Sequence, residues 1–285
     1  MSQRESAYAK INLFLDVIAK RSDGYHDIGT LFQTLDAHDD LEAEVHGMGE
    51  IRLRYDTPQD YPVEKDLVYR AAMALRVHGG AHLSADLYLH KRLPLGAGLG
   101  GGSADAAATL RLLNRMWNLN LPTKDLCDIG AKLGADVPFL IEGGTQQASG
   151  IGEILAPQSP ARLPKDVVLV VATPHCAVPT KAAYSGIRPS GTERWDLFRK
   201  RGCLAPLMPD FDLFNKFEES VLPLYPQIAT LKEAFSEDGA LRTLMSGSGA
   251  SVFAFFQGNS AAENALEKRR LLWRWGTIAH FVQHC

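Results

Sequence analysis

Cysteine is scarce in this chain of 285 residues, and its four copies lie far apart, at Cys127, Cys176, Cys203 and Cys285. No two of them have the short spacing of a cysteine-based metal site, so a structural zinc centre is not predicted. We expect free, buried thiols, as is usual for proteins of the reducing cytoplasm.

Long apolar runs and long basic runs are missing as well. No apolar run is long enough to cross a bilayer, and the N-terminal residues contain no apolar core of a signal peptide. The formal net charge is -3, which argues against a surface for nucleic acid or for an anionic membrane. We therefore expect a cytoplasmic protein that binds neither. The sequence leaves open whether it forms a homodimer.

The remaining composition is typical of a globular protein, with 46% hydrophobic and 22% charged residues. A chain of 285 residues has room for two modest domains or one large one. A polar, proline-rich stretch at residues 157–164 interrupts the patterned segments. We therefore predict a boundary there, with an N-terminal domain at residues 1–160 and a C-terminal domain at residues 161–285.

The most unusual stretch is glycine-rich and reads Pro94-Leu95-Gly96-Ala97-Gly98-Leu99-Gly100-Gly101-Gly102-Ser103-Ala104. Its glycines do not suit the interior of a helix or strand, because each loses backbone entropy and buries no side chain. Residues 83–89 alternate like a half-buried strand, and the alanine-rich residues after the run favour a helix. A glycine loop between a strand and a helix start is typical of a phosphate site, since free N–H groups and the helix dipole attract anions. A plain turn would need only one or two glycines.

Three known kinds of phosphate loop fit this run poorly. A Walker loop requires Lys after its last glycine, whereas Gly102 is followed directly by Ser103. Gly96, Gly98 and Gly101 match the dinucleotide fingerprint, but no acidic residue follows about 20 positions later to hold a ribose. A protein kinase would carry His-Arg-Asp and Asp-Phe-Gly further on, and neither occurs. A dehydrogenase and a protein kinase are therefore disfavoured.

The run instead resembles the ATP loop of the GHMP small-molecule kinases, the superfamily of galactose, homoserine, mevalonate and phosphomevalonate kinases. Two further superfamily motifs follow in order, Gly134-Ala135-Asp136-Val137-Pro138 and the glycine loop at residues 244–251, so the resemblance covers nearly the whole chain. It implies a two-domain α+β fold, the first domain like domain 2 of ribosomal protein S5 and the second ferredoxin-like. It also implies ATP as co-substrate, accompanied by Mg²⁺.

The resemblance further implies that backbone N–H groups of the loop hold the ATP phosphates, with the Ser103 hydroxyl on a phosphate or on Mg²⁺. The cofactor-binding residues that it implies are Pro94, Leu95, Gly96, Ala97, Gly98, Leu99, Gly100, Gly101, Gly102, Ser103 and Ala104. It implies no metal site made of protein side chains. Residues 64–68 also resemble a family segment whose Asn or Asp lies near the nucleotide base, although Asp66 is equally suited to be a helix N-cap.

The N-terminal part carries the features that are most specific within the superfamily. Residues 7–17 alternate as a strand, with Lys10, Asn12, Phe14 and Asp16 on one face and the apolar residues on the other. The segments at residues 8–13, 23–26 and 31–33, which include Gly24-Tyr25-His26 and Leu31-Phe32-Gln33, resemble one branch of the superfamily. That branch phosphorylates a cytidylated methylerythritol in the non-mevalonate isoprenoid pathway. Tyr184 fits a ring that the branch stacks on cytosine.

This resemblance implies a role for each candidate residue. Asp136 would orient the acceptor hydroxyl and take its proton, and Lys10 would keep Asp136 ionised and stabilise charge on the transferring group. Asn12 would hydrogen-bond the acceptor, while Tyr25, His26 and Tyr184 would hold the cytosine by stacking and hydrogen bonds. The implied function is an ATP-dependent kinase acting on the 2-hydroxyl of a cytidylated polyol phosphate.

Simpler structural roles exist for the same residues. Lys10 could extend from its strand to solvent, Asp136 could form a turn after a helix, and Tyr25 with His26 could be an aromatic pair at a hairpin end. Two other functions stay open: another GHMP kinase that acts on a sugar or on mevalonate, and a non-catalytic nucleotide-binding protein of the same fold. The presence of both Lys10 and Asp136 argues against the second.

Two further expectations concern structure alone. Residues 190–210 are poorly patterned, which predicts an exposed or mobile insertion. Ser260 and Glu263 have the spacing of a capping box, which predicts a terminal helix from Ser260 through Trp273.

Overall fold

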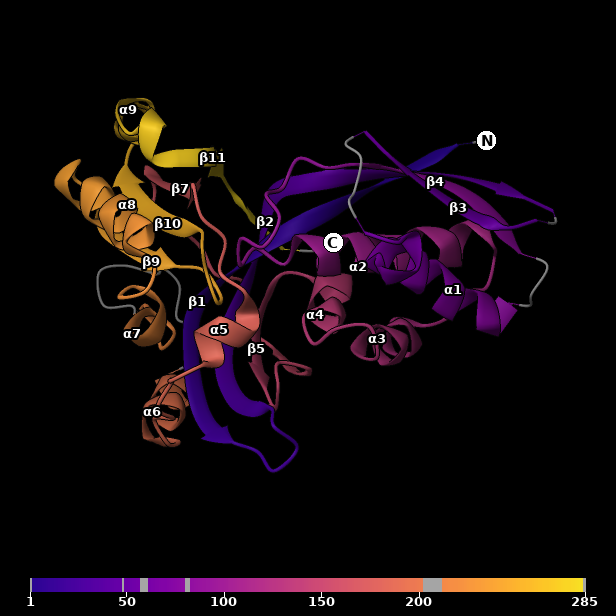
Figure 1. The fold of residues 1–285 in the computed structure, drawn as a ribbon, viewed down its shortest axis with the longest axis horizontal. Coiled ribbons are helices and arrows are strands. Elements are labelled where there is room, and N and C mark those ends of the chain that lie inside the picture. Colours follow the sequence, from indigo (N-terminus) through magenta and orange to yellow (C-terminus); the bar gives the residue numbers. More distant parts are fainter. Residues whose placement is uncertain (1, 48, 57–60, 80–82, 202–211, 284–285) are drawn as a thin grey trace.

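Two β-sheets form the framework of the molecule (Figure 1). The structure, a computed structural model, describes residues 2–47, 49–56, 61–79, 83–201 and 212–283. Cys127 and Cys176 are free thiols, as expected, but they are half-buried and not buried; Cys203 and Cys285 lie outside the described residues. Within the described residues, no helix is both long and apolar enough to cross a membrane.

The first sheet is built around a long antiparallel hairpin. Its strands are β1 (Gln3–Lys20), β2 (His26–His46), β3 (Ile51–Tyr55), β4 (Ser84–His90), β5 (Thr145–Ser149), β6 (Ile154–Pro157), β8 (Phe214–Asn215) and β12 (Phe281–Val282). The main order is β3-β4-β2-β1-β8, with β5 and β12 also pairing with β2, and β6 with β5. β8 and β12 come from the C-terminal part of the chain, which therefore adds strands to the N-terminal sheet.

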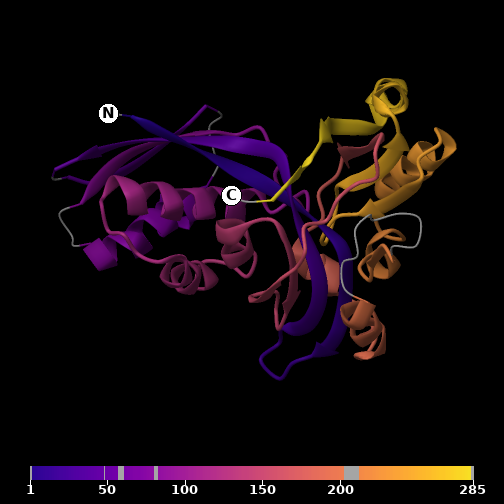
Figure 2. The ribbon, with the colours of Figure 1, turned by 180° about the vertical axis from the view of Figure 1, so that it is seen from behind.

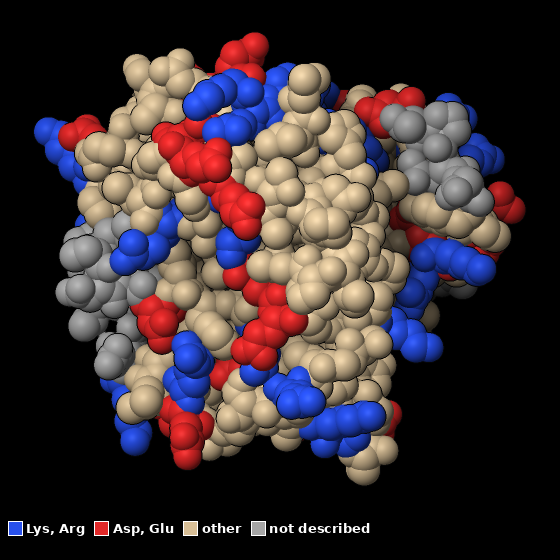
Figure 3. All heavy atoms as spheres, turned by 60° about the vertical axis from the view of Figure 1, so that its left-hand side comes forward, with Lys and Arg blue, Asp and Glu red and all other residues tan. Residues whose placement is uncertain are grey.

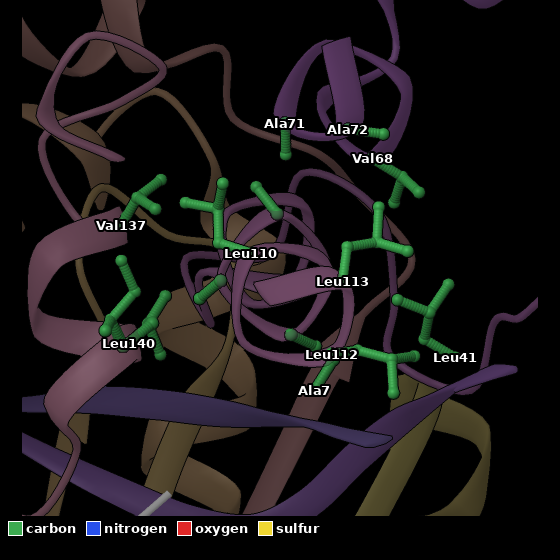
Figure 4. Close-up of a cluster of buried hydrophobic side chains, with 14 of the residues drawn as sticks. Ala7, Leu41, Val68, Ala71, Ala72, Leu110, Leu112, Leu113, Val137 and Leu140 are labelled. Carbon is green, nitrogen blue, oxygen red and sulfur yellow. The ribbon is translucent and has the colours of Figure 1, made fainter. Parts of the chain in front are cut away.

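Helices cover one face of this sheet (Figure 1). They are α1 (Leu67–Gly79), α2 (Gly101–Met116), α3 (Thr123–Ala131) and α4 (Val137–Glu142), with a 3-10 turn at Val63–Lys65. α2 runs through the centre of the core, where Leu110, Leu112 and Leu113 are fully buried (Figure 4). The strand and the helix predicted on either side of the glycine loop are therefore both present, as β4 and α2.

The second sheet is antiparallel and lies in the C-terminal part. Its strands are β7 (Val167–Pro174), β9 (Arg242–Met245), β10 (Val252–Gln257) and β11 (Trp273–Ala279), in the order β11-β7-β10-β9. The longer helices α8 (Pro226–Glu237) and α9 (Asn259–Lys268) pack against it. Three shorter helices, α5 (Thr180–Tyr184), α6 (Glu193–Arg201) and α7 (Glu218–Val221), and a 3-10 turn at Arg270–Leu272 complete this part.

The alternation predicted for β1 is right as far as Asn12 and wrong beyond it. The register with β2 shifts between Asn12 and Phe14, which marks a β-bulge. Leu15 consequently lines the central cavity, whereas Phe14 stacks on Phe198 with ring centroids 4.1 Å apart. An extra residue at a bulge shifts the two-residue period, and the apolar pattern of the strand contains no sign of it.

The described part of residues 190–210, which ends at residue 201, is mostly exposed, as expected, but it also contains a helix that was not predicted. Residues 202–210 lie outside the described residues. α6 forms there and buries Trp195 and Phe198, which are 5% and 4% exposed. Gly29 of β2 provides the space, because a Cβ at that position would lie 2.3 Å from the Trp195 ring. The two aromatic residues are three positions apart and therefore share one helix face.

The predicted terminal helix is present as α9, but it is shorter than expected and ends at Lys268. Its N-cap is Gly258 without a side-chain cap hydrogen bond, so the predicted capping box of Ser260 and Glu263 is wrong. Trp273 instead begins β11, which pairs with β7. The chain then returns to the first sheet as β12 (Figure 2). Pairing with a distant strand outweighs the local helical pattern here.

Candidate active site

The predicted site residues lie around one cavity of about 650 Å³, which is lined from both parts of the chain. Its lining includes Lys10, Asn12, Tyr25, His26, Asp136, Tyr184 and residues 94–103 of the glycine loop. Ala104 is the exception among the predicted set. It is buried in α2, and its N–H donates to the Gly100 carbonyl oxygen at 2.8 Å, so it has no N–H to offer a phosphate.

The glycine loop ends at the N-terminus of α2. Because this helix begins at Gly101, the N–H groups of residues 101–103 have no acceptor within the helix. Gly96, Gly98 and Gly100 have φ angles of 62°, 75° and 72°, in the left-handed region that favours glycine. The free N–H groups and the positive end of the helix dipole together make this end of the cavity suitable for an anion.

Gly98 is required by packing within the protein. A Cβ at this position would lie 2.1 Å from the Ser246 carbonyl oxygen, while Ser246 Oγ donates a hydrogen bond to the Gly98 oxygen at 3.0 Å. The Ser251 N–H donates to the Ala97 oxygen at 3.0 Å. These contacts join the glycine loop to the loop at residues 244–251, which carries the third motif.

Asn215 fixes the third-motif loop from β8. Its Nδ2 donates to the Met245 oxygen at 2.7 Å and to the Gly247 oxygen at 2.8 Å, and its Oδ1 accepts the Phe217 N–H at 3.0 Å. Sequence reasoning did not identify this residue as part of the site. No local signal could have found it, because its acceptors lie 30 and 32 residues further along the chain.

Lys10 contacts Asp136 inside the cavity. Its Nζ lies 3.4 Å from Asp136 Oδ2 and donates to Asn12 Oδ1 at 2.8 Å. Asn12 is itself oriented by its Nδ2, which donates to Thr30 Oγ1 at 2.8 Å. The Lys10 side chain is 5% exposed, so it does not extend to solvent. Thr30, which sequence reasoning missed, therefore orients the Asn12 amide that accepts the hydrogen bond from Lys10.

Asp136 is the N-cap of α4, and it also follows the end of α3 as expected. A capping aspartate ordinarily accepts a backbone N–H of its own helix. Asp136 makes no side-chain cap hydrogen bond, and its carboxylate contacts Lys10 instead. The carboxylate is thus available to the cavity, and local helix capping does not account for it.

Aromatic side chains line another part of the cavity. The rings of His26 and Tyr184 stack at a centroid distance of 4.7 Å and an angle of 21°, and Tyr184 meets the edge of Phe217. Tyr25 is 61% exposed. A base between two rings needs a separation of about 7 Å, twice the usual contact distance, so His26 and Tyr184 would have to move apart to admit one.

Burial changes the protonation of this aromatic pair. Burial, followed by the charge of Lys20, lowers the pKa of His26, which favours the neutral imidazole. Burial, followed by the charge of Asp136, raises the pKa of Tyr184 to about 12. Both rings therefore present neutral hydrogen-bonding groups at neutral pH.

A buried ionic cluster adjoins the glycine loop and was missed by sequence reasoning. Lys91 Nζ lies 2.5 Å from Asp39 Oδ2 and 2.8 Å from Asp105 Oδ2. Asp39 Oδ1 also accepts the N–H groups of Arg92 and Leu93, which fixes the chain just before the glycine loop. Burial raises the pKa of the Asp105 carboxyl, while Lys91 opposes that shift. This cluster supports the loop from behind.

A smaller hollow of about 150 Å³ shares Lys91, Leu95 and Gly102 with the main cavity. Asp66 lines it and caps α1, since its Oδ1 accepts the Val68 N–H at 2.7 Å. The capping role considered for Asp66 is therefore present, and the same residue also lies beside the glycine loop, where a nucleotide base could be held.

The donor set does not form a protein-only metal site. Among the described residues, no group of three His, Cys, Asp or Glu side chains could hold a metal ion. The cavity lining does contain the Asp136 carboxylate and the Ser103 hydroxyl. Such a set fits Mg²⁺ that arrives on nucleotide phosphates, because this ion usually takes only one or two carboxylates from the protein.

Comparisons with known proteins show the family to which the chain belongs. The sequence model described as GHMP kinases N terminal domain matches residues 66–144, and the one described as GHMP kinases C terminal matches residues 196–273. A curated 4-diphosphocytidyl-2-C-methyl-D-erythritol kinase from Burkholderia mallei is 41% identical over 98% of this chain and 94% of its own length.

Solved structures indicate the same family and also show the fold. A crystal structure of 4-(cytidine 5'-diphospho)-2C-methyl-D-erythritol kinase has a TM-score of 0.78 at 31% identity and covers 97% of this chain and 99% of its own. Homoserine kinase from Cytophaga hutchinsonii, with a TM-score of 0.72 and 22% identity over 96% of both chains, shares the fold. These matches confirm the two-domain α+β fold expected from the motifs. The chain belongs to the GHMP kinase family, in the branch of the 4-diphosphocytidyl-2-C-methyl-D-erythritol kinases.

Proposed function

We propose that this chain is the ATP-dependent kinase that phosphorylates the 2-hydroxyl of 4-diphosphocytidyl-2-C-methyl-D-erythritol in the non-mevalonate isoprenoid pathway. One observation carries the proposal: the contact of Lys10 with Asp136, at 3.4 Å, lies in the same cavity as the glycine loop and the stacked His26 and Tyr184 rings. A phosphate donor, a reacting hydroxyl and a pyrimidine base thus each have chemically suitable neighbours in one space.

In this proposal, the glycine loop binds the ATP phosphates through the N–H groups of residues 101–103 and the Ser103 hydroxyl. Mg²⁺ bound to the phosphates would neutralise charge on the transferring group, with Asp136 and Ser103 as the available protein donors. Phosphoryl transfer depends mainly on positioning and charge stabilisation, so the rigid attachment of this loop to the third motif matters for catalysis.

At the acceptor end, Asp136 orients the 2-hydroxyl and accepts its proton. Lys10 is held by Asn12 and stays beside Asp136, where its positive charge stabilises the negative charge that develops on the transferring group. Asn12 in turn offers its amide to the acceptor. Tyr25, His26 and Tyr184 bind the cytosine, which requires the stacked rings to separate when the base enters.

Cellular location, domain division and the kind of partner follow from the same function. We propose a cytoplasmic protein with a small-molecule acceptor, divided into domains at residues 1–160 and 161–285, and we leave dimer formation open. On the face that Figure 3 draws, basic and acidic side chains are interspersed and do not gather by sign. This distribution suits a small-molecule enzyme better than a protein with a nucleic-acid surface.

Turnover with different acceptors tests the proposal. The purified chain, ATP and Mg²⁺ are mixed with the cytidylated methylerythritol, and ADP release is followed while phosphorus NMR identifies the new phosphate monoester. We expect turnover with this acceptor and none with mevalonate, homoserine or galactose. Turnover of one of these instead would favour another GHMP kinase activity. ATP binding without turnover of any acceptor would favour a non-catalytic protein.

A further inference from the structure

Lys181 differs from the other lysines of the cavity by having no acidic partner. Three lysines line the cavity: Lys10, Lys91 and Lys181. Lys10 contacts Asp136, and Lys91 contacts two buried carboxylates. Within the described residues, no carboxylate lies within ion-pair distance of the Lys181 ammonium. The side chain is exposed, so its charge is available to a ligand.

The position of Lys181 on α5 links it to the aromatic end of the cavity. Thr180, Lys181 and Tyr184 of this helix all line the cavity, and Lys181 and Tyr184 are three positions apart, on neighbouring turns of one face. Ala183 is buried on the opposite side, and its carbonyl oxygen accepts the Ser220 hydroxyl at 2.8 Å. α5 is thereby held with Lys181 and Tyr184 on the side that lines the cavity.

The other end of α5 approaches the reacting groups. Thr180 Oγ1 lies 3.4 Å from Ser248 Oγ in the third-motif loop. The neighbouring Gly247 is close to Lys10, because a Cβ on it would lie 3.3 Å from the Lys10 Nζ. A continuous line of contacts therefore runs from Lys10 through residues 247–248 and Thr180 to Tyr184. The two hydroxyls lie along this line, and Lys181 is the next residue after Thr180 and lines the same cavity.

We propose that Lys181, together with the Thr180 and Ser248 hydroxyls, binds the diphosphate that joins cytidine to the polyol of the acceptor. The inference rests on the proposed function, since it places the base at Tyr184 and the reacting hydroxyl at Lys10 and Asp136. A ligand held at both ends must lay its diphosphate across the stretch between them. A lysine is a suitable partner there, because its ammonium binds phosphate as a flexible point charge.

The diphosphate takes no part in bond making, so its contact with Lys181 is the same before and during phosphoryl transfer. An interaction of this kind strengthens binding and leaves the chemical step unchanged. Lys181→Ala should therefore raise the KM for the acceptor by about fivefold to thirtyfold, a range between an exposed ion pair and a charge-assisted hydrogen bond. The kcat and the KM for ATP should stay within about twofold.

Two control variants separate charge from structure. Lys181→Arg keeps the positive charge and should recover most of the acceptor affinity. Lys165→Ala removes an exposed lysine outside the cavity lining and should have no effect, which controls for the change in net charge. Thermal melting of all three variants should match the parent protein. If Lys181→Ala leaves the acceptor KM unchanged, or raises the KM for ATP instead, the inference is wrong.

Truncated ligands test the same contact without turnover. Calorimetry with cytidine and with cytidine diphosphate compares a ligand that lacks the diphosphate with one that carries it. Lys181→Ala should weaken the binding of cytidine diphosphate by the same fivefold to thirtyfold and leave the affinity for cytidine unchanged. This result supports the inference even if the parent protein does not phosphorylate the proposed acceptor. Equal effects on both ligands, or none on either, would overturn it.

Discussion

Lys10 Nζ and Asp136 Oδ2 lie 3.4 Å apart, although one residue is in the first strand and the other begins α4. Lys10 is buried and bound to Asn12, while the Asp136 side chain makes no cap hydrogen bond to its own helix. Local secondary structure accounts neither for the burial of the Lys10 ammonium nor for the uncapped carboxylate of Asp136. The contact between the two side chains accounts for both. Their contact is the geometric basis for assigning a proton acceptor and a charge-stabilising group to this cavity.

Asp136→Asn should lower kcat by about 100-fold to 10,000-fold, because an amide cannot take the proton of the acceptor hydroxyl. ATP affinity, measured by calorimetry, should not change. Lys10→Ala should give a similar loss, and the double variant should lose little more, because residues that act as one unit are not additive. Asp128→Asn on the exposed face of α3 is the matched control. Losses that multiply in the double variant would mean independent roles.

Gly101→Val should weaken ATP binding by at least about tenfold while the protein still folds. A Cβ at Gly101 would lie 3.6 Å from Leu93 Cβ and from Lys91 Nζ, so the valine methyls also press on the cluster behind the loop, and thermal melting of the variant must accompany the binding measurement. Gly47→Val is the matched control, because a Cβ there meets nothing within 4 Å. Calorimetry with ATP measures the effect, and unchanged affinity would remove the loop from the nucleotide site.

Gly98→Ala should act differently from Gly101→Val, since its Cβ would overlap the Ser246 carbonyl oxygen. Overpacking typically costs about 1–3 kcal/mol, so we expect a lower midpoint of chemical unfolding. Separation of the two loops would also reduce activity. A Gly98→Ala protein as stable as its parent would show that the two loops can move apart without cost.

Tyr184→Ala should raise the KM for the acceptor by about tenfold to a hundredfold, since stacking of a base on an aromatic ring contributes about 1–3 kcal/mol. Tyr184→Phe keeps the ring and should retain most of the affinity. ATP binding should be unaltered in both variants. Steady-state kinetics at saturating ATP measures the change, and an unchanged KM in Tyr184→Ala would mean that the ring serves packing alone.

Asp16→Asn should stabilise the protein at neutral and alkaline pH. Asp16 is fully buried, and burial raises the pKa of its carboxyl, although hydrogen bonds from Ser190 and from the Val17 N–H oppose that shift. A carboxyl with a raised pKa in the folded state destabilises the fold as pH rises, because ionisation is easier in the unfolded chain. The gain should be largest at pH 8 and should vanish below about pH 3, where aspartate is protonated in both states. A gain that is independent of pH would contradict this reasoning.

The sequence by itself determined the parts of this protein that depend on contiguous residues. The glycine run, the strand before it and the alanine-rich helix after it were predictable, because glycine and alanine act on the backbone locally. The family followed from three motifs in order, and with it Lys10, Asp136 and the aromatic residues as candidates. Each motif has a short, continuous pattern that needs no knowledge of its neighbours in space.

Tertiary structure alone decided the features that depend on distant partners. The bulge in β1 turns Leu15 toward the cavity, and Asn215 and Asp39 fix the loops through bonds to residues far along the chain. The predicted terminal helix ended early at Lys268, and its last expected residue, Trp273, instead begins β11, which pairs with β7. Hydrogen bonds and packing between remote segments outweigh local preferences of a fraction of a kcal/mol per residue, and a linear sequence does not state which segments will meet.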